Sequence, residues 1–287
     1  MKLQMIYSFY IADNECNNEI YELHYNMINQ ISFLFDKITI IICHDGNHYD
    51  DIVKRIKFKF IDILNCNNIS IIYEQNIKKY REGIIYKKYI IDKLDQYDDY
   101  ITFFAHSKGV TNINGLSNLD NLKLWIFSLY YLNFKWINEV KRKLNTYSIL
   151  NNYTQLHDYF SYGCLYFKDY RHNNINNWFY SGSFQWLNTY KINKYIKENN
   201  ININQFICEE DERLKRCAEL FIGSIFDENH CGFHNDEQYN KKTNFFNMYG
   251  WEISYNNINE LIQLYLKYHE YNTFYKDFLN LYIQYDE

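Results

Sequence analysis

The chain has 287 residues, of which 47% are hydrophobic and 23% charged, so it can bury a sizeable core and has the composition of a globular protein. Its formal net charge is −5, whereas proteins that bind nucleic acid through phosphate contacts usually carry a surplus of basic residues. Nucleic acid is therefore not expected as a partner. Seven scattered cysteines without a Cys-x-x-Cys pair argue against a disulfide framework and a zinc–cysteine site.

The first residues are apolar but short, and they lack a small-residue cleavage site. No stretch approaches the ~18 uninterrupted apolar residues of a membrane span. We therefore expect a cytoplasmic protein without a membrane span.

The N-terminal half alternates segments of strand-like and helix-like pattern. β-branched runs and helical apolar spacing predict strands at 4–12, 38–43, 69–73 and 100–105, and helices at 18–35, 49–64 and 82–96. Such alternation predicts an α/β fold with a mainly parallel sheet flanked by helices. Ligands bind such sheets beyond the carboxyl ends of the strands, which here are residues 10–13, 44–46, 74–76 and 106–109.

The second half has a less regular pattern. It predicts one long helix or a helical pair at 119–144, a helix at 209–222, strands at 160–167 and 178–187, and helices at 257–284. No internal repeat or linker divides the chain. We therefore expect one α/β domain over residues 1–250, with residues 251–287 as a helical C-terminal extension packed on it.

The strongest chemical signal is the segment that ends the predicted strand 100–105, namely His106-Ser107-Lys108-Gly109. The glycine allows a tight turn after the strand. A lysine at a strand end can pair with a diphosphate, and a histidine can donate to phosphate, ligate a metal or move a proton. A solvated turn with a surface lysine explains the same residues equally well.

Two further segments follow predicted strands. Arg81 and Glu82 open a helix, where the helix N-terminus favours anions and Arg81 adds a positive charge, although an ordinary capped helix has the same pattern. Asp45 could accept hydrogen bonds from a base or a ribose, but an aspartate beside Gly46 is also a common turn residue.

Two acidic residues are candidates for a general base. Glu219 lies among apolar neighbours in a carboxylate-rich segment, and a carboxylate in such surroundings suits proton transfer. Asp211, earlier in the same segment, is the second candidate. The alternative is an amphipathic helix with Glu219 facing solvent or paired with Arg216.

A metal site is suggested by His230 and His234, with Asp227, Asp236 and Glu237 nearby. The histidine spacing suits a helix, but a glycine between them predicts a loop, and two histidines are weak evidence for a metal. The metal requirement stays open. The sequence contains no Walker A loop, G-x-G-x-x-G, H-E-x-x-H or G-x-S-x-G motif.

Five segments in one order resemble a family of bacterial and viral glycosyltransferases with the A-type nucleotide-sugar fold. They are Arg81-Glu82-Gly83-Ile84-Ile85, His106-Ser107-Lys108-Gly109-Val110, Tyr162-Gly163-Cys164, Tyr180-Ser181-Gly182-Ser183-Phe184-Gln185-Trp186, and the segment from Arg216 to Gly223. The chain departs from the family at Ser183 and Gln185, where Asn and Trp are usual. It also lacks the Asp-x-Asp that many A-type members place at the strand end occupied here by His106.

The resemblance implies a Rossmann-like nucleotide-sugar-binding sheet that moves a hexose from a nucleotide diphosphate, UDP by family habit, to a glycan or protein acceptor. Lys108 could replace the charge of a divalent cation, while His106 could still ligate one. Two alternatives stay open: a nucleotide- or sugar-binding module without turnover, and a phage or viral glycosyltransferase that modifies DNA.

The resemblance also assigns roles to residues at the predicted site. The nucleoside pocket would contain Tyr10 and Asp45, and the diphosphate site would contain Arg81, Glu82, His106 and Lys108. The border of the sugar and acceptor site would consist of Ser181, Gly182, Ser183 and Trp186. The catalytic group would consist of Glu219, Asp211 and His106.

Overall fold

The structure is a computed structural model. It describes residues 2–11, 18–44, 54, 56, 58–60, 69–75, 81–96, 100–107, 119–135, 137–145, 159–163, 166–168, 178–206, 217–227, 231–233 and 263.

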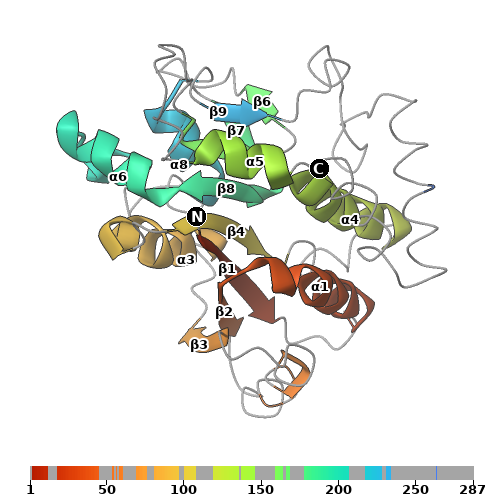
Figure 1. Cartoon of the computed structure of the whole chain (residues 1–287). Coiled ribbons are helices and arrows are strands. Elements are labelled where there is room, and N and C mark those ends of the chain that lie inside the picture. Colours follow the sequence, from red (N-terminus) through yellow and green to blue (C-terminus); the bar gives the residue numbers. More distant parts are fainter. Residues whose placement is uncertain are drawn as a thin grey trace.

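A mixed, mostly parallel sheet forms the centre of the molecule (Figure 1). In the described part of the chain its strand order is β3-β2-β1-β4-β8-β5-β9, and β8 is the strand that runs antiparallel to its neighbours. The strands are β1 (Lys2–Ile11), β2 (Lys37–His44), β3 (Ile69–Gln75), β4 (Tyr100–His106), β5 (Ser161–Gly163), β8 (Gln185–Asn188) and β9 (Cys231–Phe233). A second, antiparallel pair consists of β6 (Tyr166–Lys168) and β7 (Trp178–Tyr180).

Helices cover both faces of the sheet, so the predicted α/β class is confirmed. One face packs against α1 (Asn18–Ile31), α4 (Leu119–Lys135) and α5 (Ile137–Leu144). The other packs against α3 (Arg81–Tyr89), η3 (Ile91–Gln96), α6 (Thr189–Glu198) and α8 (Cys217–Ile225). Figure 1 shows α1 on one side of β1 and α3 on the other. Short 3₁₀ turns lie at η2 (Ser32–Leu34), η5 (Ser181–Ser183) and η6 (Ile203–Gln205).

The helix boundaries follow local sequence signals. α1 buries Ile20, Leu23, Met27 and Ile31, which lie on one face at helical spacing. At the start of α6 the Asn188 side chain accepts from the backbone N–H of Lys191 at 2.8 Å, which caps the helix.

Several predicted elements differ in detail from the structure. The segment 82–96 is α3 followed by η3, the segment 119–144 is the helical pair α4 and α5, and the predicted strand 178–187 is β7, η5 and β8. Helix α6 was not predicted. Residues 54, 56 and 58–60 are helical, within the predicted helix 49–64. In the predicted C-terminal extension, residue 263 is helical, and the rest of the extension lies outside the described residues.

Membrane insertion was not expected from the sequence. Within the described part of the chain, none of the helices combines the length and the hydropathy needed to cross a bilayer.

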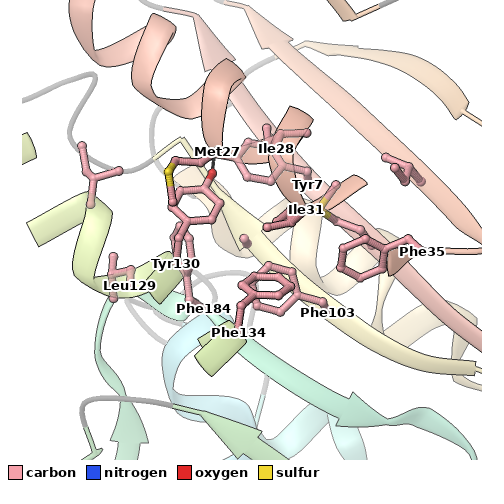
Figure 2. Close-up of a cluster of buried hydrophobic side chains, with 14 of the residues drawn as sticks. Tyr7, Met27, Ile28, Ile31, Phe35, Phe103, Leu129, Tyr130, Phe134 and Phe184 are labelled. Atoms are coloured by element: carbon pink, nitrogen blue, oxygen red, sulfur yellow. Dashed lines mark hydrogen bonds between the residues drawn. The ribbon is translucent and has the colours of Figure 1, made fainter. Parts of the chain in front are cut away.

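Aromatic side chains fill the core on the α1–α4 side of the sheet (Figure 2). Phe103 of β4 lies edge-on to Phe134 of α4, with ring centroids 4.8 Å apart, and the Trp186 ring centroid lies 4.7 Å from that of Phe103. The Trp186 indole N–H donates to the Asn133 carbonyl at 3.1 Å, so its polar atom is satisfied inside the core.

Three polar side chains meet within this core. The Tyr130 hydroxyl donates to the Tyr7 hydroxyl at 2.9 Å, and both hydroxyls lie near His24 Nδ1, at 3.1 and 2.8 Å. Burial raises the pKa of Tyr7 well above its usual range, and Tyr130 adds to the effect. The Tyr7 hydroxyl therefore stays protonated, and the buried hydrogen bonds of the cluster join β1, α1 and α4.

Replacing Tyr7 with Phe should lower the free energy of unfolding by about 1–3 kcal/mol, because the change removes a hydroxyl that both His24 and Tyr130 contact, at a place far from water. Urea unfolding measures the change. As a control, Tyr190→Phe removes a hydroxyl from a side chain that is 41% exposed and should change stability by less than about 0.5 kcal/mol. Equal effects of the two substitutions would show that the cluster does not contribute to stability.

Candidate functional site

The carboxyl ends of β1 and β4 lie side by side at one edge of the sheet. Ser8 pairs with His106 in the parallel register. Beyond that pair, the Ser107 hydroxyl accepts from the Tyr10 N–H at 2.8 Å and contacts the Tyr10 carbonyl at 3.2 Å. Ser107 therefore fixes Tyr10 next to the end of β4, and the two predicted site residues Tyr10 and His106 share the edge at which parallel sheets bind ligands.

His106 is 8% exposed, and its Nε2 atom lies 3.0 Å from the carbonyl oxygen of Gly182. A carbonyl oxygen can only accept, so Nε2 carries a proton in this arrangement. The imidazole also lies against Phe184, with ring centroids 6.0 Å apart. In this arrangement His106 cannot ligate a metal through Nε2, and it holds the turn that contains Gly182.

That turn, η5, has an unusual backbone. Gly182 has a φ of +79° and Ser183 a φ of +58°, so two consecutive residues adopt left-handed conformations. Ser183 is fully buried, and its hydroxyl has no hydrogen-bond partner among the described residues. A Cβ on Gly182 would lie 3.0 Å from a methyl group of Leu129. Non-glycine residues at positive φ gather at ligand sites more often than elsewhere, which makes η5 a candidate.

The end of β5 supports the chain on the other side of η5. A Cβ on Gly163 would lie 2.5 Å from the Tyr180 ring, and the Ser161 and Tyr180 hydroxyls are 3.1 Å apart. The absent side chain of Gly163 therefore leaves the space that the Tyr180 ring occupies. This contact fixes Tyr180 immediately before the turn.

Helix α8 brings Glu219 to the same region. It packs against η5, β7 and α3. The Gln185 side-chain amide donates to the Ala218 carbonyl at 2.7 Å, which connects the first residue of β8 to the first turn of α8. Because β8 is antiparallel to β4, this first residue lies toward the carboxyl end of β4. Glu219 directly follows Ala218 in α8, and its side chain is partly exposed.

Helix α3 is anchored to the sheet by Glu74, near the end of β3. The Glu74 carboxylate accepts from the Lys88 ammonium and from the Tyr89 hydroxyl. Burial alone would raise the pKa of Glu74, but these hydrogen bonds and the Lys88 charge outweigh burial and lower the pKa below its usual value. These contacts hold the last turn of α3. The helix packs against α8, and Glu82 in its first turn is partly exposed.

The structure places one predicted site residue, Trp186, away from this edge. Trp186 lies in the core and packs on Phe103, which gives it a structural role that the sequence did not indicate. Among the described residues no three His, Cys, Asp or Glu side chains form a group that could hold a metal. Outside the described residues, or with side chains that are not described, lie Asp45, Arg81, Lys108, Ser181, Asp211, His230, His234, Asp236 and Glu237.

Three contributors to the site stand within the motifs quoted for the resemblance but were assigned no role from the sequence: Ser107, Gly163 and Gln185. Ser107 stands inside the predicted motif, between His106 and Lys108, so the sequence indicated its place at the strand end. Its hydrogen bond with the Tyr10 N–H could not be predicted from the sequence. Gly163 and Gln185 contact groups that are distant in sequence: the Tyr180 ring and the backbone carbonyl of Ala218.

Fold and site together define an α/β protein with polar groups gathered at the carboxyl ends of neighbouring parallel strands. Comparison with protein-family models finds no match, and no curated protein is significantly similar in sequence. The resemblance to A-type glycosyltransferases stays a prediction that rests on the motifs.

Replacing Glu74 with Gln should lower stability at neutral pH and make it less dependent on pH on the acid side. A carboxyl whose pKa is lowered by folding adds stability above its unfolded pKa of about 4.3, and that contribution is lost as the pH falls through the folded value. The stability gap between wild type and variant should therefore narrow between about pH 5 and pH 3. Urea midpoints across this range measure it.

The matched control is Glu198→Gln, because Glu198 belongs to an exposed pair with Lys194 at 3.8 Å. Its stability should follow the wild type at every pH. A gap for Glu74→Gln that stays constant down to pH 3 would contradict the pKa direction assigned to this carboxyl.

Proposed function

We propose that the chain is a glycosyltransferase that moves a hexose from a nucleotide diphosphate sugar, with UDP as the nucleotide, to a glycan or protein acceptor. The observation that carries the proposal is the meeting of three elements at one sheet edge. These are the end of β4 with His106, the left-handed turn Gly182–Ser183, and helix α8 with Glu219.

The donor diphosphate would bind beyond the ends of β1 and β4. Lys108 directly follows Ser107, whose side chain is bound to the backbone of Tyr10. Arg81 opens α3, and a helix N-terminus favours anions. Two cations at this edge would neutralise the charge that develops on the diphosphate when its bond to the sugar breaks.

The transfer step needs a base on the acceptor side. In our proposal the Glu219 carboxylate takes the proton of an acceptor hydroxyl as that oxygen attacks the anomeric carbon of the sugar. The bond between this carbon and the diphosphate oxygen breaks, and its electron pair leaves with the diphosphate. The position of Glu219 on α8, which packs against η5, supports this role.

A UDP-hexose at a fixed concentration should raise the melting temperature more than ATP or NAD does, because a ligand that binds the folded state stabilises it by mass action. Thermal-shift measurement of the three ligands tests this. The Lys108→Met variant keeps most of the side-chain stem without its charge and should show a smaller shift with the UDP-hexose. Equal or greater stabilisation by NAD would reject a nucleotide-sugar donor.

Replacing Glu219 with Gln should leave UDP-hexose affinity close to that of the wild type and lower turnover by about 10²–10⁴-fold, the usual contribution of a well-placed acid–base group. Gln keeps the size of the side chain but cannot take the proton. Turnover per folded molecule and donor affinity are measured in parallel, with Glu198→Gln as the control. Wild-type turnover in folded Glu219→Gln protein would exclude this base and direct attention to Asp211.

A further inference from the structure

We propose that the Ser183 hydroxyl binds a hydroxyl group of the donor hexose, and that His106 is the positioning residue that holds the turn presenting it. This inference rests on the proposed function, because it concerns the sugar part of a nucleotide-sugar donor. It changes the role of His106, which the motif alone placed at the diphosphate or in the catalytic group.

Ser183 combines two features that are unfavourable in a folded chain without ligand. Its φ of +58° is a conformation that glycine adopts readily and serine rarely. Its hydroxyl is buried, and none of the described residues offers it a hydrogen bond. Buried polar groups are nearly always paired in native proteins, so a bound molecule is the natural source of the missing partner.

His106 supplies the contact that keeps this turn in place. Its Nε2 proton is donated to the carbonyl of Gly182, which belongs to the same peptide unit as the backbone nitrogen of Ser183. Pairing of Phe104 with Gln185 in the antiparallel register, extended by two residues, sets His106 opposite Ser183. The imidazole therefore fixes the peptide that orients Ser183, and the nearby Phe184 ring limits the movement of the imidazole.

A second buried polar atom, two residues further along the chain, bears on which chemical group the turn binds. Gln185 is also buried, and its amide nitrogen is used by the Ala218 carbonyl. Its Oε1 atom has no hydrogen-bond partner among the described residues. This oxygen can only accept, whereas the Ser183 hydroxyl can donate and accept. A diphosphate offers acceptors alone, while the hydroxyls of a sugar offer donors as well, so this part of the site fits the hexose better than the diphosphate.

The first test compares Ser183→Ala with the wild type. Removing an unpaired buried hydroxyl should leave the melting temperature unchanged or slightly higher, because nothing in the ligand-free chain is lost. Affinity for UDP-hexose should fall by about 3–10-fold, as expected for one lost hydrogen bond, while affinity for UDP stays the same. Calorimetric titration with UDP and with UDP-glucose, UDP-galactose and UDP-N-acetylglucosamine measures both quantities.

The second test concerns His106. Phe removes the donor from the ring, and Gln restores an N–H donor near the position of Nε2. His106→Phe should lower the affinity for UDP-hexose even though Ser183 is still present, and it should leave the affinity for UDP unchanged. His106→Gln should recover part of the lost UDP-hexose affinity. A role that is only structural would lower both affinities together with the folded fraction.

The outcomes separate this inference from the proposed function. If the wild type binds none of the UDP-sugars, the proposed function fails and the role of Ser183 fails with it. If the wild type binds a UDP-hexose and Ser183→Ala binds it equally well, only the role of Ser183 is overturned. If His106→Phe weakens UDP as much as UDP-hexose, then His106 acts on the diphosphate and not through the turn.

Discussion

The pairing of β4 with two different neighbours is the constraint on which the structure depends. One edge of β4 forms a parallel ladder with β1, and the other forms an antiparallel ladder with β8. The strand therefore joins the regular parallel half of the sheet to the half that contains β5 and β9. It also places His106 between the end of β1 and the turn before β8, so the candidate site exists because this strand has both neighbours.

Burial on both faces makes that double pairing stable. Phe103 packs with Trp186 and Phe134 on the α1–α4 side, while Phe104 packs edge-on against Tyr86 of α3, with ring centroids 4.8 Å apart, on the other. A polar pair also joins neighbouring strands inside the sheet, where the Gln4 side-chain amide donates to the Thr102 hydroxyl at 2.7 Å. Such bonds favour one register, since a slip by one residue would separate the pair.

Much of the fold could be predicted because the strands of the parallel half are buried on both faces. A continuous apolar run such as residues 38–43 is typical of that environment, and the spacing in residues 18–35 is typical of a helix. The direction of β8 could not be predicted, because apolar pattern carries no information on strand direction. The role of Trp186 was hidden for a related reason: its burial follows from pairing with Phe103, and paired residues share a face.

The candidate site was predictable only in part. The end of β4 was identified from a motif that is local in sequence, and Tyr10 from its place at the end of another predicted strand. The partner of His106 is 76 residues away, and it is reached only through the pairing of β4 with β8. The packing of the turn also depends on distant elements, because Leu129 of α4 lies against Gly182.

The contact between Gly163 and Tyr180 links two positions in a way that affects how the sequence can vary. The aromatic ring occupies the volume that a side chain at position 163 would need. A larger residue at 163 is therefore compatible with the fold only when position 180 becomes smaller at the same time. In related chains that keep this support for the turn, positions 163 and 180 should change together. A glycine in β5 that lies against an aromatic residue of β7 can therefore identify the turn where little other sequence similarity is left.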